Sequence, residues 1–115
     1  MIFKRGDVIL VRFPNSDLKS FKKRPAIVVQ ADGLATNMPQ TIIALITSNT
    51  ARTGSTRVHF QQNSHEGQVM GLCTDSVVVT DNLATVLDRE IDQSIGHCPT
   101  MSVIDQAVKQ TLGLN

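Results

Sequence analysis

The run Lys22-Lys23-Arg24 is the part of this sequence whose residue types can most directly do chemistry. It leads without a spacer into Pro25 and the apolar residues 26–29. Proline fixes its own φ and biases the preceding residue toward extended geometry, so Arg24 should be held at the start of a strand. A guanidinium is permanently charged and presents a planar fork of donors, whereas lysine offers a point charge. The combination suits a phosphate, although short basic runs also occur simply as solvated loops ahead of core strands.

The cysteines and histidines show no spacing that is typical of a metal site. Cys73 and Cys98 form no C-x-x-C pair, and two free thiols are expected. His59, His65 and His97 are scattered, and none has a cysteine or a second histidine at a ligand interval. The sequence therefore predicts no metal site and no cofactor.

The formal net charge is only +1, but the two halves of the chain differ strongly. Residues 1–57 hold nine Lys and Arg against three acids, a charge of +6, whereas residues 58–115 hold two against seven, a charge of −5. Such asymmetry can give a nearly neutral protein the basic face that nucleic-acid binding needs. The chain has four Phe and neither Trp nor Tyr, so base stacking cannot be its main binding mode, although Phe21 could serve one base.

The composition indicates one folded domain over residues 1–115. Apolar residues make up 41% of the chain and charged residues 18%, and the length suffices for one hydrophobic core. No apolar run approaches the roughly 20 residues of a membrane span, and residues 1–7 lack the features of a signal peptide. A cytoplasmic location is therefore expected.

Short apolar runs predict a mainly β fold that would position the basic residues. Strands are expected over residues 7–13, 25–30, 41–47, 57–61, 76–80, 84–86 and 94–97. The segments between them are expected to be a basic loop over 14–23, a hairpin connection over 63–68, a turn at 81–82 and a helical turn over 88–91.

One full helix is expected at the C-terminus, where Met101, Ile104, Val108 and Leu112 share one face. Ser102 followed by Asp105 has the character of a capping box, and Gly113 should end the helix. Many short strands followed by one terminal helix indicate a small, strongly curved β-barrel. Because so small a barrel has little room inside, a ligand is expected on its surface loops.

Five short segments follow one another along the chain: Gly6-Asp7-Val8, Arg24-Pro25-Ala26-Ile27-Val28-Val29, Ile46-Thr47-Ser48, Asp75-Ser76-Val77 and Ile95-Gly96. As an ordered set over essentially the whole chain, they resemble the PemK/MazF family of toxin endoribonucleases. The resemblance implies an SH3-like barrel of the CcdB/PemK type and a homodimer with a groove across its interface. It also implies metal-independent cleavage of single-stranded RNA or mRNA at a short sequence, and inhibition by a cognate antitoxin of a type II toxin-antitoxin system.

The resemblance also assigns residues. The arginine of the family's R-P motif falls on Arg24, and its threonine at the end of the third strand falls on Thr47. An acidic residue that some relatives use would fall on Asp81. Many relatives place a basic residue just before the threonine that is Thr85 here, and this chain has Ala84 instead, so a second arginine at the phosphate is not expected.

Without a metal, RNA is most readily cut when its own 2′-hydroxyl attacks the adjacent phosphorus. Arg24 would then stabilise the charge that develops on the phosphate oxygens, and Thr47 would orient the phosphate or the attacking hydroxyl. A guanidinium is a poor proton acceptor, so Asp81 or a water molecule is expected to be the base, with His59 as the rival.

Further RNA contacts are expected from Lys19, Lys22, Lys23, Ser48 and Asn49. An acidic antitoxin tail that folds as it binds could block such a basic groove. Two alternatives stay open for the same fold: a toxin resembling CcdB, which binds DNA gyrase and cleaves nothing, and a catalytically inactive RNA-binding regulator.

Overall fold

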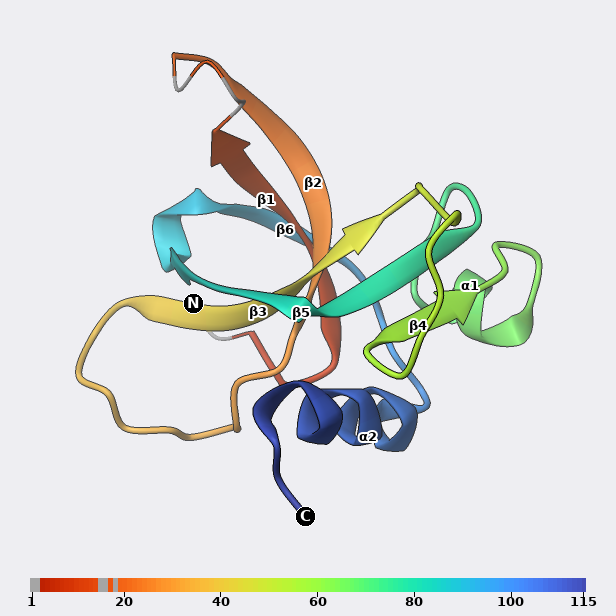
Figure 1. Cartoon of the computed structure of the whole chain (residues 1–115). Coiled ribbons are helices and arrows are strands. Elements are labelled where there is room, and N and C mark those ends of the chain that lie inside the picture. Colours follow the sequence, from red (N-terminus) through yellow and green to blue (C-terminus); the bar gives the residue numbers. More distant parts are fainter. Residues whose placement is uncertain (1–2, 15–16, 18) are drawn as a thin grey trace.

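The computed structural model describes residues 3–14, 17 and 19–115. Its elements, in chain order, are β1 (Asp7–Pro14), β2 (Phe21–Val28), β3 (Gln40–Thr47), β4 (Arg57–Phe60), α1 (His65–Val69), β5 (Ser76–Leu87), the 3-10 helix η1 (Asp88–Glu90), β6 (Ile91–His97) and α2 (Met101–Leu112). The strands form one antiparallel sheet in the order β4-β5-β3-β2-β1-β6. Figure 1 shows α2 lying below this curved sheet and the β1–β2 hairpin rising away from it.

The expected mainly β fold with a C-terminal helix is confirmed. β4 and β6 are the two edges of the sheet, and within the described residues they do not pair with each other. The sheet is therefore curved but open, and the expected SH3-like barrel describes it only loosely.

The central strands are apolar on both faces because each face meets a different cluster of side chains. In β1, Val8 packs into one cluster, while Ile9 and Val11 pack into the other. The same alternation places Ile27 of β2 in the first cluster and Ala26 in the second. Burial on both sides explains why these strands appear in the sequence as continuous apolar runs.

The C-terminal helix covers the first cluster with Ile104, which is fully buried. Leu112, expected on the same face, is instead 52% exposed. As predicted, Gly113 ends the helix: it adopts the left-handed conformation (φ 69°), and its N–H bonds to the Lys109 carbonyl. No helix in the described part of the chain is long and apolar enough to cross a membrane.

The capping box expected at the start of α2 is wrong. The N-cap residue is Thr100, and it makes no side-chain capping hydrogen bond. Asp105 forms an ion pair with Arg5, whose Nε also donates to the Val29 carbonyl oxygen. This pairing ties the helix to the segment before β1 and to the end of β2, so a long-range contact takes the carboxylate that the local pattern assigned to a cap.

The run Lys22-Lys23-Arg24 lies in a strand. The loop predicted over 14–23 is therefore wrong at its two ends, since residue 14 belongs to β1 and residues 21–23 belong to β2. β2 begins at Phe21, and its ladder with β1 places Arg24 opposite Val11. Pairing with β1 therefore overrides the low strand propensity of the basic run. The result is a long hairpin that carries the cations on an extended backbone.

β5 is one strand where two strands and a turn were expected. Adjacent residues of β3, Ala44 and Leu45, pair with Leu83 and Val79, so residues 80–82 form a bulge where the turn was expected. The segment 63–68, expected to be a hairpin connection, instead contains the start of α1. Five residues of helix are too few to show a period in the sequence.

The segment after α1 is pressed against β6 through two glycines. Gly71 has φ +74°, and a Cβ added there would lie 2.1 Å from the Ile95 carbonyl oxygen. At Gly96, a Cβ would lie 2.4 Å from the carbonyl carbon of Met70. Only a backbone without side chains at these two positions can pack so closely, and this packing forms one wall of the site described next.

Candidate active site

A cleft of about 310 Å³ opens where β2, the end of β3 and the segment after α1 meet. Five residues predicted for the site line this cleft: the cations Lys22, Lys23 and Arg24 and the hydroxyl residues Thr47 and Ser48. Among the described residues that line it, none carries a carboxylate. The cleft is therefore built to receive an anion.

Arg24 and Thr47 reach the cleft from neighbouring strands. The β2–β3 ladder pairs Ala26 with Leu45, and two further residues along each strand lead to Arg24 and to Thr47. Arg24 is half-buried and its backbone belongs to the β1–β2 ladder, whereas within the described part of the chain its side chain makes no hydrogen bond or ion pair. Its planar fork of donors is thus held by the strand yet available to a ligand.

The hydroxyl of Thr47 is oriented by the turn that follows β3. The backbone N–H of Asn49 donates to Thr47 Oγ1 at 3.1 Å, and the Asn49 side chain in turn accepts from the N–H of Ala51 at 3.1 Å. Ser48 lines the cleft, whereas Asn49 does not. The structure thus gives Asn49 a part in closing the turn.

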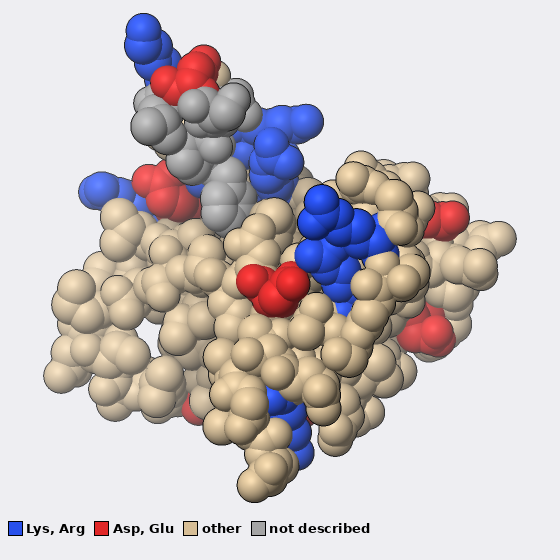
Figure 2. Space-filling model, viewed as in Figure 1, with Lys and Arg blue, Asp and Glu red and all other residues tan. Residues whose placement is uncertain are grey.

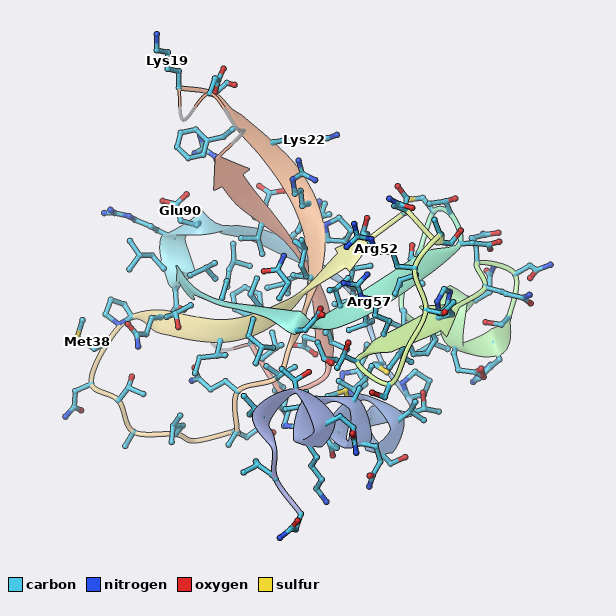
Figure 3. The ribbon with its side chains drawn as sticks, viewed as in Figure 1. Lys19, Lys22, Met38, Arg52, Arg57 and Glu90 are labelled. Carbon is cyan, nitrogen blue, oxygen red and sulfur yellow. The ribbon has the colours of Figure 1, made fainter. Side chains whose placement is uncertain are left out.

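Lys22 and Lys23 add positive charge beside Arg24. Lys23 Nζ lies 3.3 Å from a carboxylate oxygen of Asp92, but both side chains are well exposed, so the pair leaves Lys23 largely available. In Figure 3, Lys22 points away from the hairpin into solvent. Both side chains can therefore move toward an incoming anion.

Lys19 lies outside the cleft, at the tip of the hairpin (Figure 3). The turn that carries it is closed by Asp17, whose Oδ1 accepts from the backbone N–H groups of Lys19 at 2.9 Å and Ser20 at 3.1 Å. These amide donors, first Lys19 and then Ser20, lower the pKa of the Asp17 carboxyl from its ordinary value. On the hairpin stem, Arg12 stacks on the exposed ring of Phe21, 5.1 Å from its centroid.

The floor and the far wall of the cleft contain residues that sequence reasoning missed. Leu10, Pro25, Ile46 and Ile95 give it an apolar floor. The far wall is the segment from Gly71 to Thr74, together with Ser76, and it includes the exposed thiol of Cys73. The glycines at positions 71 and 96 were the available signal, because a close backbone approach requires them.

Asp81 is placed away from the cleft, in the β5 bulge. Thr47 pairs with Val77, so four residues of strand, about 13 Å, separate Asp81 from the level of Thr47. Its carboxylate instead lies 3.4 Å from the guanidinium of Arg57. Within one chain, Asp81 is thus an ion-pair partner and does not face a phosphate held in the cleft.

His59, the rival base, also lies outside the cleft. It is an exposed residue of β4, and its Nε2 lies 3.0 Å from the Arg52 carbonyl oxygen. A carbonyl only accepts, so Nε2 must carry the proton in this contact. The ring thus anchors the loop between β3 and β4.

The structure contains a larger hollow of about 400 Å³ near the start of the chain, but its acids are already engaged. Asp32 accepts from the Arg5 backbone N–H at 2.8 Å, and Asp88 accepts from the Thr41 hydroxyl at 2.7 Å. Across the described residues, no three His, Cys, Asp or Glu side chains are grouped so that they could hold a metal ion. The cleft at Arg24 therefore remains the strongest candidate.

Comparison with solved structures shows the same fold in known toxins. An endoribonuclease in complex with its cognate antitoxin, from a mycobacterial species, has a TM-score of 0.75 and 23% identity, covering 99% of this chain and 98% of that one. Mycobacterium tuberculosis toxin MazF-mt6 has a TM-score of 0.74 and 22% identity over 95% and 98% of the two chains. MazE-MazF from Deinococcus radiodurans has a TM-score of 0.72 and 16% identity over 100% and 99%.

The sequence itself gives the family. No curated protein sequence matches the chain. A family model does, described as PemK-like, MazF-like toxin of type II toxin-antitoxin system, and it covers residues 4–112. Because this match spans nearly the whole chain, the protein belongs to the PemK/MazF family of toxins of type II toxin-antitoxin systems.

Proposed function

We propose that this toxin is an endoribonuclease that cleaves single-stranded RNA, including mRNA, at a short sequence and without a bound metal ion. The observation that carries the proposal is the cleft in which Arg24 and Thr47 meet beside Lys22 and Lys23. A phosphodiester is the anion that fits a planar donor fork, a hydroxyl and two point charges. One of the similar structures is described as an endoribonuclease, which supports the same activity.

In the proposed reaction, the 2′-hydroxyl oxygen of the RNA forms a bond to the adjacent phosphorus, and the bond from phosphorus to the 5′-oxygen of the next nucleotide breaks. The products are a 2′,3′-cyclic phosphate and a 5′-hydroxyl. Arg24 donates to the non-bridging phosphate oxygens, where negative charge grows in the transition state. Losing one pre-aimed donor of this kind costs roughly 3 kcal/mol, about a hundredfold in rate.

Thr47 acts as a hydrogen-bond donor to the phosphate. The amide of Asn49 already occupies one acceptor position of Oγ1, so the hydroxyl proton is free to point into the cleft. Water takes the proton from the 2′-hydroxyl, and solvent protonates the departing 5′-oxygen. Water is assigned this role because neither Asp81 nor His59 lines the cleft.

Membership of the PemK/MazF family suggests that the protein acts as a homodimer, with the clefts opening onto a shared RNA groove, in the cytoplasm, where mRNA is present. The charge of the cleft suggests the second partner. A cognate antitoxin with an acidic segment blocks the same cations and competes with RNA. Similar structures are described as toxin complexes with a cognate antitoxin or with MazE, which supports this partner.

The test is to incubate the purified protein with a long single-stranded RNA in EDTA and to map the ends of any fragments. Discrete fragments with 2′,3′-cyclic phosphate ends are expected, and they should be lost in Arg24→Ala. RNA left intact by the wild type, with inhibition of DNA gyrase, would instead identify a toxin that resembles CcdB. Bound but uncut RNA would identify an inactive RNA-binding regulator.

A further inference from the structure

A second group of cations lies on the molecule, away from the hairpin. In Figure 2, Lys and Arg atoms gather around the hairpin and again over the middle of the visible face, with acidic atoms at the border of the second group. Figure 3 places Arg52 and Arg57 at this second position. We call these two residues the arginine pair. Neither lines the cleft at Arg24, so the proposed chemistry does not use them.

The loop that carries Arg52 is held in place at both ends. At the cleft end, Thr47 Oγ1 accepts a hydrogen bond from the backbone N–H of Asn49. At the far end, the Thr56 carbonyl accepts from both the backbone N–H of Thr80 at 3.0 Å and its hydroxyl at 2.7 Å. Between these ends, His59 bonds to the Arg52 carbonyl. The position of Arg52 relative to the cleft is therefore set by the structure.

The arginine pair is within reach of a strand that lies in the cleft. Ser48 lines the cleft, and Arg52 follows it only four positions later in the chain. Even a fully extended chain would place their Cα atoms at most about 14 Å apart. An RNA strand held at Arg24 can thus pass over the loop and meet Arg52 after a few nucleotides.

Arg57 keeps hydrogen-bond donors for an anion although an acidic residue lies beside it. Its side chain is 19% exposed, and one terminal nitrogen lies 3.4 Å from Asp81. A guanidinium has five N–H donors, so this long contact leaves donors for a second oxygen ligand. Arg52 is exposed, so its side chain is accessible to the same ligand.

We propose that Arg52 and Arg57 form a second phosphate-binding site, which holds the RNA backbone on one side of the bond that is cut. This inference rests on the proposed function and deepens it. It gives Asp81 a role different from that of the base expected from the sequence: Asp81 lies beside Arg57 and partly offsets its charge. The arginine pair therefore contributes to the binding of long RNA and leaves the chemical step unchanged.

The test measures binding as a function of salt. The RNA carries a 2′-deoxy residue at the mapped cleavage position, which removes the attacking hydroxyl, and it is prepared as a long strand and as a short strand that spans only the cleft. Each phosphate contact to single-stranded RNA contributes about 0.7 to the slope of log K against log salt. Arg52→Ala should lower that slope by about 0.7 for the long strand and leave it unchanged for the short strand.

Two further variants separate the explanations. Arg89→Ala is the matched control, because the Arg89 side chain is 80% exposed and, among the described residues, its one ion pair is with its neighbour Glu90. It should leave both slopes unchanged. Asp81→Asn should tighten binding of the long strand by about two- to fivefold, the range of an exposed charge pair. It should also keep the cleavage rate of an all-ribose version of the short strand, which retains the attacking hydroxyl.

The inference is overturned if Arg52→Ala behaves like Arg89→Ala on the long strand, or if Asp81→Asn abolishes cleavage. An Arg52→Ala variant that binds RNA normally but loses affinity for an acidic antitoxin peptide would overturn it as well. Failure of the wild type to cut any RNA is a separate result, since it removes the proposed function itself. Thermal unfolding of Asp81→Asn checks that its fold is intact.

Discussion

The backbone N–H of Asn49 donates a 3.1 Å hydrogen bond to Thr47 Oγ1. This bond occupies one acceptor position of the hydroxyl oxygen and leaves its proton available to a ligand in the cleft. Thr47→Val keeps the shape of the side chain and removes the hydroxyl, so we expect the single-turnover cleavage rate to fall by about ten- to a hundredfold, the loss of one hydrogen bond that strengthens in the transition state.

The control is Thr50→Val, an exposed hydroxyl in the same loop and outside the cleft. It should cleave like the wild type. Because the Asn49 amide is exposed and can bond to water, Thr47→Val should change the free energy of unfolding by no more than about 1 kcal/mol. Full activity in Thr47→Val would remove Thr47 from the mechanism.

Arg24→Ala should reduce cleavage by about a hundredfold or more, because it deletes the permanent charge aimed at the phosphate. Arg24→Lys should recover little of this loss, since an ammonium group cannot present two parallel donors to one phosphate. Both variants should fold normally, because within the described residues Arg24 has no ion pair to lose. Rates measured at saturating RNA, with circular dichroism as the fold check, decide the outcome.

His59→Ala should leave the cleavage rate and its pH dependence within about threefold of the wild type, because the ring anchors a loop outside the cleft. A general base that is positioned at the reacting group contributes about a hundredfold or more, so the two roles are easily separated. The measurement is a pH–rate profile from pH 5 to 9. A limb near neutral pH that vanishes in the variant would make His59 the base after all.

Gly71→Ala should destabilise the fold by at least ~2 kcal/mol, because the new Cβ would lie 2.1 Å from the Ile95 carbonyl oxygen. Gly33→Ala is the matched control: its φ is +72°, close to the +74° of Gly71, but nothing lies within 4 Å of its Cβ position. Gly33→Ala should lower the free energy of unfolding by only ~1 kcal/mol, the penalty of a left-handed conformation for alanine. Urea unfolding of both variants measures the difference. Equal losses of unfolding free energy would mean that the segment at Gly71 can move away from β6 at little cost.

Acid should loosen the hairpin tip before it affects the core. The amides of Lys19 and Ser20 lower the pKa of Asp17 in the folded state. The unfolded state therefore holds the proton more tightly, so the stabilisation is present above the ordinary carboxyl range and is lost as the pH falls through the lowered pKa. The protection factors of the Lys19 and Ser20 amides, which correct for the pH dependence of intrinsic exchange, should decrease below that range in the wild type. Asp17→Asn, which carries no titrating group, should show no such step, and an identical acid response in both would contradict this role.

Much of the fold could be predicted from the sequence because its strands are buried on both faces. The continuous apolar runs of β1 and β3, together with the helix that ends at Gly113, appear in the sequence as they appear in the structure. The elements that were missed depend on distant contacts. β2 extends into the basic run because β1 pairs with it, and Asp105 turns to Arg5 rather than to a cap.

The candidate site was predictable where it follows strand register and hidden where it depends on packing. The resemblance assigned Arg24 and Thr47 to one site, and the β2–β3 register brings them to one cleft, because Thr47 ends β3 and Arg24 lies in β2 just before its apolar part. The wall at Gly71 and Cys73 could not, since it is formed by a segment folding against β6. The sequence also could not assign Asp81 to the bulge, because bulges and turns contain the same kinds of polar residue.

The cleft takes its lining from Leu10 near the beginning of the chain and from Ile95 near its end. During synthesis, the polypeptide leaves the ribosome from its first residue onward, so β6 emerges among the last elements. A nascent chain therefore lacks one side of its cleft until β6 has been translated, and a product truncated before β6 never completes it. The architecture thereby delays the formation of the cleft until this strand has left the ribosome.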